Sequence, residues 1–291
     1  MGASRIYRRW FTAPAVAIYT LLFIVPVLLS FYYSLTNWNA VKMTHETAKF
    51  VGLANFEKIF SNADLTAVII RTIWFALATS AAKNVLGFLL ALAFNQGLKT
   101  KSALRAVFFL PSMLSPLIIG LMFGSLFMTK GSVNQLLEAI GFGYLARPWL
   151  TTKSTALGAA MIVDIWRSMG YDMVIYLAGL QLIDPGLYEA ASIDGASWGQ
   201  KLKSITLPLM VPSIVINLLL NVSSGLKVFD IIMVLTNGGP VGATEVINTM
   251  VYREFGKSLY GMSTAYGVVM FAVTAVFGLA ILRLSNRKSD V

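Results

Sequence analysis

Long apolar stretches recur six times along the chain and are separated by shorter polar segments. Each is long enough for a helix to cross the hydrocarbon core of a bilayer, which takes about 20 residues. The pattern therefore predicts an all-α integral membrane protein with six transmembrane helices in a single domain over residues 1–291. The predicted spans are at about residues 13–35, 68–95, 106–129, 155–182, 211–235 and 258–282.

One polar segment, residues 184–209, carries its own helix signals. Asp184 is a suitable N-cap for a helix that starts at the proline after it, and Gly195 is placed to end that helix. Ser197 is a suitable cap for a second helical turn, which we expect Pro208 to end. The segment is thus predicted to be a compact helix-turn-helix, and a polar loop folded so tightly is typical of a docking surface.

The composition agrees with a membrane location. Hydrophobic residues make up 57% of the chain and charged residues 12%, against roughly a quarter charged in soluble domains, and the mean hydropathy is +0.72. The net charge of +10 arises from basic residues dispersed at the ends of apolar segments, as with Arg5, Arg8 and Arg9 before the first span. This distribution indicates orientation in a membrane rather than nucleic-acid binding, and it predicts that both termini are cytoplasmic.

The chain offers few residues for catalysis or metal binding. It has no cysteine, and its single histidine, His45, lies in a polar loop. An intramembrane enzyme would have only serine or aspartate chemistry available, and no such motif is evident. We therefore expect a protein that is not an enzyme and has no metal site.

Polar residues inside two of the predicted spans recur at helical spacing. One set occupies one face of the fourth span and the other set one face of the fifth span. Such stripes either line a shared aqueous cavity or form hydrogen bonds between helices, and spacing alone leaves both readings open. The two sets are Asp164, Arg167, Ser168 and Tyr171, and Asn221, Ser224, Gly225 and Val228.

Charged residues at membrane depth need partners. Lys227 and Asp230 are one turn apart in the fifth span, so we expect them to pair, and Asp164 and Arg167 offer a second pair. Lys83 has no local partner, so we expect it to reach one on another span.

An alternative use of the intramembrane charges is an ion-coupled secondary transporter with a relay of Asp164, Asp172 and Lys227. Many such transporters contain an internal repeat, and none is visible between the two halves of this chain.

Three short motifs at fixed spacing carry a family resemblance. Glu189-Ala190-Ala191, Asp194-Gly195-Ala196 and Ile205-Thr206-Leu207-Pro208 resemble the EAA loop of importer-type ABC permeases. The resemblance extends over most of the chain. The segments FVGLANF, FFLPSMLSP and FDIIMVLTNGGP, at residues 50–56, 108–116 and 229–240, resemble the carbohydrate-importer permeases, and specifically the MalF-type half.

The resemblance implies the type I importer permease fold, with residues 184–209 as a cytoplasmic coupling helix seated in a separate ABC ATPase dimer. That ATPase would bind ATP and Mg, so no cofactor is expected in this chain. The other implied partners are a MalG-type second permease, an extracytoplasmic solute-binding protein, and a sugar or oligosaccharide, all at a bacterial inner membrane. The implied coupling residues are Glu189, Ala190, Ala191, Asp194, Gly195 and Trp198.

The resemblance also favours the cavity reading of the two polar stripes. Family positions that contact sugar match six residues of the fourth and fifth spans, and Arg167 is added to them because it lies in the same register. The implied substrate-binding residues are Ser168, Tyr171, Asn221, Ser224, Gly225, Val228 and Arg167.

Overall fold

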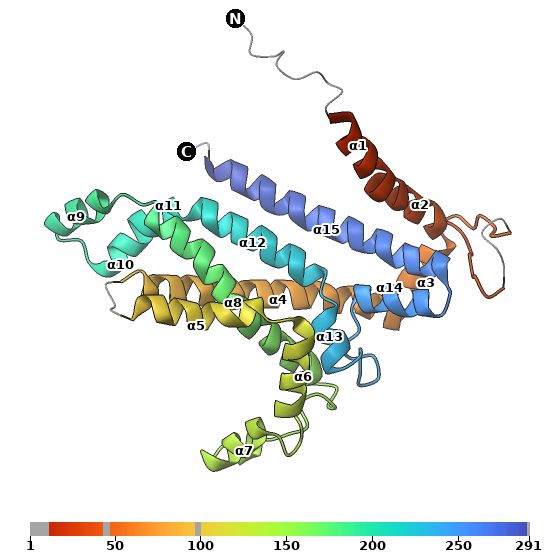
Figure 1. The fold of residues 1–291 in the computed structure, drawn as a ribbon, viewed down its shortest axis with the longest axis horizontal. Helices are drawn as coiled ribbons and strands as arrows, with labels where there is room; N and C mark the ends of the chain where they lie inside the picture. Colours follow the sequence, from red (N-terminus) through yellow and green to blue (C-terminus); the bar gives the residue numbers. More distant parts are fainter. Residues whose placement is uncertain (1–11, 43–46, 97–99, 290–291) are drawn as a thin grey trace, which may run out of the picture. The chain divides into compact units, whose positions relative to one another are not determined.

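The computed structural model describes residues 12–42, 47–96 and 100–289, with side chains described as far as Arg283. The described residues are nearly all helical and contain no strand, only an isolated bridge between Thr36 and Phe50 (Figure 1). The chain divides into two compact units, the first reaching to Thr66 and including Met250–Ala272, the second being Ala67–Thr249 with the C-terminal residues. The N-terminal arginines and His45 lie outside the described residues.

The first unit begins with a continuous apolar helical segment. It consists of α1 (Ala13–Tyr19), η2 (Thr20–Ile24), which is wound as a π-helix, and α2 (Val25–Ser34). Most of its side chains are exposed, although its mean hydropathy is 2.2. An apolar helix without a buried face within its unit suits contact with lipid.

Backbone hydrogen bonds and aromatic contacts hold the rest of the first unit together. In α3 (Ala54–Ser61), the Asn55 amide donates to the carbonyl oxygens of Ser34 and Thr36, each at 2.8 Å. The unit also contains most of α14 (Ile247–Gly256) and the start of α15 (Tyr260–Ser289). There the rings of Trp38 and Tyr260 meet edge to face at 4.8 Å.

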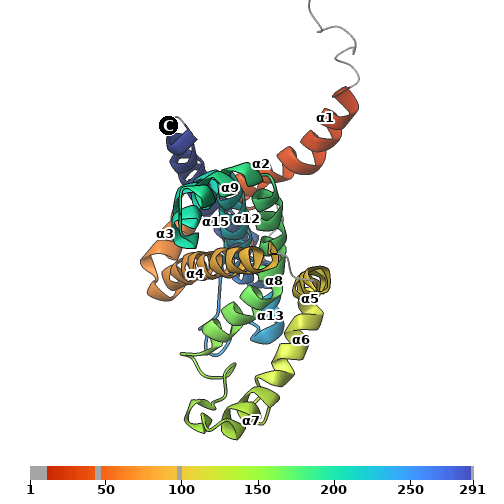
Figure 2. The ribbon, with the colours of Figure 1, turned by 90° about the vertical axis from the view of Figure 1, so that its left-hand side faces the viewer.

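Four helices lie side by side in the second unit (Figures 1 and 2). They are α4 (Ala63–Phe94), α5 (Lys101–Met113), α8 (Ala156–Gln181) and α12 (Val211–Leu226). These helices arise from hydrophobic stretches that are too long and too apolar to be exposed to water on every side, so the helices pack against one another.

Two glycines show how closely the backbones of these helices approach one another. A Cβ atom on Gly170 of α8 would lie 1.8 Å from the carbonyl oxygen of Phe108 in α5. A Cβ atom on Gly225 of α12 would lie 2.8 Å from the Cα atom of Ala76 in α4. Both distances are too short for any side chain, so small residues permit these packings, as is common between membrane helices.

Two apolar clusters fill the two ends of the α8 interface. One gathers around Phe75, Val163 and Ile232, and the other around Met173 and Met210. The polar residues of α8 that the sequence singled out lie between these clusters. The polar site is therefore enclosed along the helix by packed apolar layers.

The third predicted span is not one helix. α5 ends at Met113, and α6 (Pro116–Leu126) continues at 97° to it. Leu114 and Ser115 are extended between them, because a residue before proline avoids the helical region, and the Ser115 side chain caps α6. The short α7 (Ser132–Ala139) and η3 (Gly143–Leu145) follow.

The prediction of a continuous fifth span is also wrong. α12 ends at Leu226, and α13 (Asp230–Leu235) begins after a three-residue break. The freed carbonyl oxygen of Lys227 accepts a hydrogen bond from the Asn248 side chain at 2.7 Å, so the break remains satisfied. Because the break removes the helical register, no ion pair joins Lys227 to Asp230 among the described residues, contrary to the prediction.

By length and composition, three described helices can each cross a membrane, or up to five if each bent pair is one span. The bent pairs are α5 with α6, and residues 198–209 with α12, which meet at 66°. α8 is long enough but carries three charged residues along its length. The count of six spans stays a prediction.

Candidate functional site

The first arm of the predicted helix-turn-helix is α9 (Pro185–Ile193). Its N-cap is Asp184, whose side chain accepts a hydrogen bond from the backbone N–H of Gly186 at 2.9 Å, as predicted. Gly195 follows the helix with φ +76°, and the N–H of Ala196 donates to the carbonyl of Ala191 at 2.9 Å. This is a Schellman C-cap, which favours glycine at the left-handed position.

The second arm begins at α10 (Trp198–Lys201) with a complete capping box between Ser197 and Gln200. Two side-chain hydrogen bonds join the arms. The hydroxyls of Tyr188 and Thr206 lie 2.9 Å apart, and Lys201 donates to the Ser192 hydroxyl at 2.7 Å. The loop is therefore a folded hairpin with its own hydrogen bonds.

Pro208 does not end the second arm, contrary to the prediction. The chain continues from α10 through η4 (Leu202–Thr206) and α11 (Leu207–Leu209) before it bends into α12. η4 is wound as a π-helix, which widens the turn before the proline. A proline lacks an N–H and clashes with the carbonyl four residues earlier, so the wider winding lets the helix pass.

The tip of the hairpin exposes apolar side chains. Ile193 is 87% exposed and Trp198 68% exposed, and Leu187 is also exposed. Exposed apolar residues grouped on an otherwise polar hairpin indicate an interaction surface. Leu187 and Ile193 were not among the predicted coupling residues, although apolar residues inside a polar loop were a visible signal for them. Of the predicted residues, Ala191 is half-buried, and the exposed ones are Glu189, Ala190, Asp194, Gly195 and Trp198.

The second candidate site is a pocket of about 250 Å³ between α8 and α12. It brings together five of the seven predicted substrate-binding residues and adds three that were not on that list. Asp172 is one of the additions; a charged residue next to Tyr171 was its signal in the sequence. The lining residues are Ser112, Arg167, Ser168, Tyr171, Asp172, Leu220, Asn221 and Ser224.

The other two predicted substrate-binding residues lie elsewhere. Gly225 faces Ala76 of α4, so its position serves helix packing and lines neither pocket. Val228 lines a neighbouring pocket of about 120 Å³, located where α6 begins at Pro116 and where the chain breaks after α12. This charged pocket also contains Lys227 and Asp230, and it shares Arg167 and Ser224 with the larger pocket.

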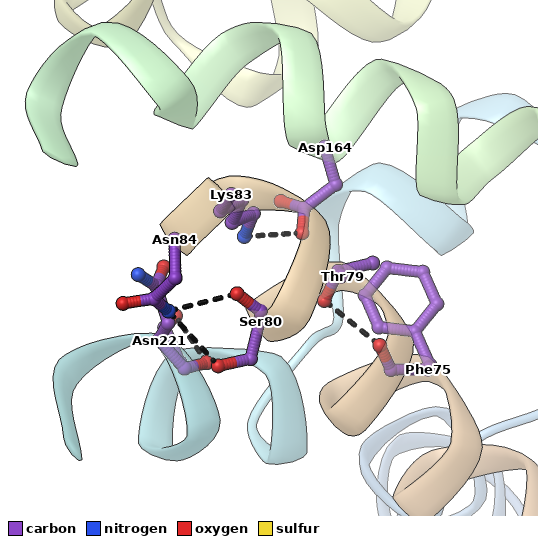
Figure 3. A network of polar contacts seen from close by, with 8 residues as sticks. Phe75, Thr79, Ser80, Lys83, Asn84, Asp164 and Asn221 are labelled. Carbon is purple, nitrogen blue, oxygen red and sulfur yellow. Dashed lines mark hydrogen bonds and ion pairs between the residues drawn. The ribbon is translucent and has the colours of Figure 1, made fainter. Parts of the chain in front are cut away.

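A buried ion pair forms one wall of the charged pocket (Figure 3). Lys83 of α4 and Asp164 of α8 lie 2.6 Å apart, with side chains 3% and 11% exposed. This confirms that Lys83 reaches a partner on another span. The predicted pairing of Asp164 with Arg167 is absent from the described residues, because Asp164 is oriented toward Lys83.

Interhelical hydrogen bonds surround the larger pocket, so both readings of the polar stripes have support in the geometry. The Tyr176 hydroxyl donates to the side chain of Asn84, linking α8 to α4. The amide of Asn217 in α12 donates to the backbone carbonyl of Asp172 in α8 at 3.2 Å. Whether the pocket residues contact a substrate stays a prediction.

Comparison with known families and proteins identifies what the chain is similar to. Residues 83–290 match the family model described as binding-protein-dependent transport system inner membrane component. The probable starch degradation products transport system permease protein AmyD of Thermoanaerobacterium thermosulfurigenes is 30% identical over 96% of this chain and 93% of the relative. The trehalose/maltose transport system permease protein MalF of Thermococcus litoralis is 32% identical over 95% of this chain and 92% of the relative.

The fold is also similar to a solved importer. A chain from a crystal structure of a bacterial alginate ABC transporter, in complex with alginate pentasaccharide-bound periplasmic protein, superimposes with a TM-score of 0.79. The two are 26% identical, and the match covers 96% of this chain and 93% of that chain. The predicted all-α fold of importer-type permeases is thereby confirmed.

Proposed function

Because this chain belongs to the family of binding-protein-dependent transport system inner membrane components, we propose that it is the permease subunit of an ATP-driven ABC importer for a sugar or oligosaccharide. Relatives that match nearly its whole length carry names of starch-product and trehalose/maltose permeases. It is a multi-pass membrane protein that transports rather than catalyses, and ATP and Mg are bound by the partner ATPase.

The observation that carries the coupling role is the exposed apolar tip of the 184–209 hairpin. A rigid hairpin with Ile193 and Trp198 exposed suits insertion into a cleft of another protein, where those side chains lose contact with water. We assign this role to contact with the ATPase dimer. Because the ATPase is cytosolic, the hairpin and both chain termini are cytoplasmic.

Two further partners complete the importer. A MalG-type second permease forms the translocation path with this chain, and an extracytoplasmic solute-binding protein delivers the substrate. The likeness to a transporter solved together with its loaded periplasmic protein supports this assembly.

The pocket between α8 and α12 is our candidate for the substrate site. It combines an aromatic ring, an arginine and hydroxyl and amide groups, which suit the face and the hydroxyls of a sugar ring. Given the names of the relatives, maltose, trehalose and maltotriose are the substrates to test first.

The test is sugar uptake by the complete importer in proteoliposomes containing this chain, its second permease and its ATPase, with the solute-binding protein added outside. Uptake of at least one of the three sugars should require internal ATP. Gly195→Asp, which forces a side chain into the left-handed cap, and Ala191→Arg should abolish uptake while the subunit remains inserted. Gly199→Ala, in the same loop with open space around it, is the control.

Two results would contradict the proposal. Uptake of none of the three sugars by the wild-type importer would refute the substrate class, and normal uptake by both loop variants would refute the coupling role. The ion-coupled alternative gains no support, since Asp164 is engaged by Lys83. It predicts uptake that collapses with a proton or sodium ionophore and persists without ATP.

A further inference from the structure

Two buried polar atoms at the larger pocket have no hydrogen-bond partner within the described structure. They are Oδ2 of Asp172 and Nδ2 of Asn221. The residues are 1% and 4% exposed, and both line the pocket beside Tyr171. Buried polar groups in native proteins are nearly always satisfied, so an unsatisfied acceptor and donor in one pocket call for a missing partner.

The packing holds Asp172 in this position. Its Cβ atom lies 2.6 Å from where a Cβ of Gly87 would stand, so α4 closes one side of the residue. Its backbone carbonyl accepts the hydrogen bond from Asn217 of α12. Asn221 lines the same pocket from α12, and by hydrogen-bond geometry neither its Nδ2 atom nor Oδ2 of Asp172 has a partner. The two groups are therefore placed next to each other by three helices and not by their own bond.

A hydroxyl is the group that satisfies both atoms at once, because it donates one hydrogen bond and accepts others. We propose that Asp172 and Asn221 together bind one hydroxyl of the transported saccharide, which donates to Oδ2 of Asp172 and accepts from Nδ2 of Asn221. Asp172 then determines specificity for that hydroxyl. This inference rests on the proposed function and adds to it a residue that was not among the predicted substrate-binding residues.

The neighbours in the pocket suit this arrangement. Tyr171 is 47% exposed, so its ring offers a face against which a sugar ring can lie. Ser168 and Ser224 offer hydroxyls to further positions of the same sugar. A polar site built around a substrate hydroxyl discriminates strongly against an analogue that lacks it, because the site's own polar groups are then left unpaired.

The experiment compares uptake of a sugar with uptake of its monodeoxy analogues. The probe is whichever of maltose, trehalose and maltotriose the wild-type importer takes up fastest, together with analogues lacking one hydroxyl each. The variants are Asp172→Asn and Asn221→Ala, with Thr79→Val as the control. Thr79 is buried on α4, bonds only the carbonyl of Phe75 and lines neither pocket.

The measured quantity is the ratio of parent to deoxy uptake at limiting sugar, normalised to assembled complex. Discrimination by the solute-binding protein is the same for every variant and cancels when these ratios are compared. For one hydroxyl, we expect the wild-type ratio to fall about tenfold or more in both Asp172→Asn and Asn221→Ala. Ratios for the other hydroxyls, and all ratios of Thr79→Val, should stay at wild-type values.

Three results would overturn the inference while leaving the proposed function intact. Unchanged ratios in Asp172→Asn would mean that the carboxyl meets only water or Asn221. Changes at different hydroxyls in the two variants would mean that they do not share one. Failure of Asp172→Asn to assemble, with unchanged ratios in Asn221→Ala, would reduce the pair to helix packing. If the wild-type importer takes up none of the three sugars, the proposed function itself fails.

Discussion

Removing one partner of the Lys83–Asp164 pair should destabilise the protein strongly. At 2.6 Å and an effective dielectric constant of about 20, two unit charges attract by about 6 kcal/mol. Much of that attraction offsets the cost of burying both charges, so the intact pair contributes little net stability. A single substitution leaves the other charge buried and alone, which costs about 3–5 kcal/mol.

The variants are Lys83→Met, Asp164→Leu and the double substitution. We expect each single variant to lower the free energy of unfolding by about 3–5 kcal/mol and the double variant to regain most of that loss, because no charge is then left unpaired. The control is Lys257→Met. Lys257 pairs with Glu254 at a similar 2.7 Å, but the two side chains are 60% and 9% exposed, so one partner of this pair is in solvent and loss of Lys257 should cost less than loss of Lys83.

The assay is denaturant titration of the purified permease complex, together with the steady-state yield of assembled complex in membranes. The reasoning depends on burial rather than on distance. It would be refuted if Lys83→Met were no more damaging than Lys257→Met, or if the double variant were less stable than either single one.

Three further predictions concern topology, substrate and packing. In intact cells, a cysteine introduced at Ser61 should react with a membrane-impermeant thiol reagent and one at Ser192 should not; the reverse pattern would overturn the orientation. Tyr171→Ala should lower sugar uptake per assembled complex by about tenfold, whereas a lower yield with unchanged normalised uptake would leave Tyr171 with a packing role only. Gly170→Ala should reduce the assembled yield, because the added Cβ atom would meet the Phe108 carbonyl. Gly158→Ala in the same helix has open space around the added Cβ atom and should be neutral or slightly stabilising. Equal effects of the two substitutions would refute the close-approach argument.

Local signals in the sequence predicted the fold of the 184–209 hairpin well. Asp184, Gly195 and Ser197 act on backbone groups within a few residues of themselves, so their capping roles follow from composition and order alone. The apolar stretches predicted the helices for the same reason, since a membrane span is a property of a continuous segment. The polar stripes of α8 and α12 were also visible, because helical spacing places residues on one face.

Only the tertiary structure decided where the helices break and which charges meet. Pro116 marks one break in the sequence, but the end of α12 at Leu226 has no proline and depends on partners such as Asn248, which lies far along the chain. Lys83 and Asp164 pair across two helices, and no spacing rule connects residues that far apart. Gly225 shows the same limit: periodicity put it in the polar stripe of the fifth predicted span, and the packing of α12 against α4 turned it away from the pocket. Contacts between helices depend on their relative rotation, which side-chain packing sets and local sequence does not.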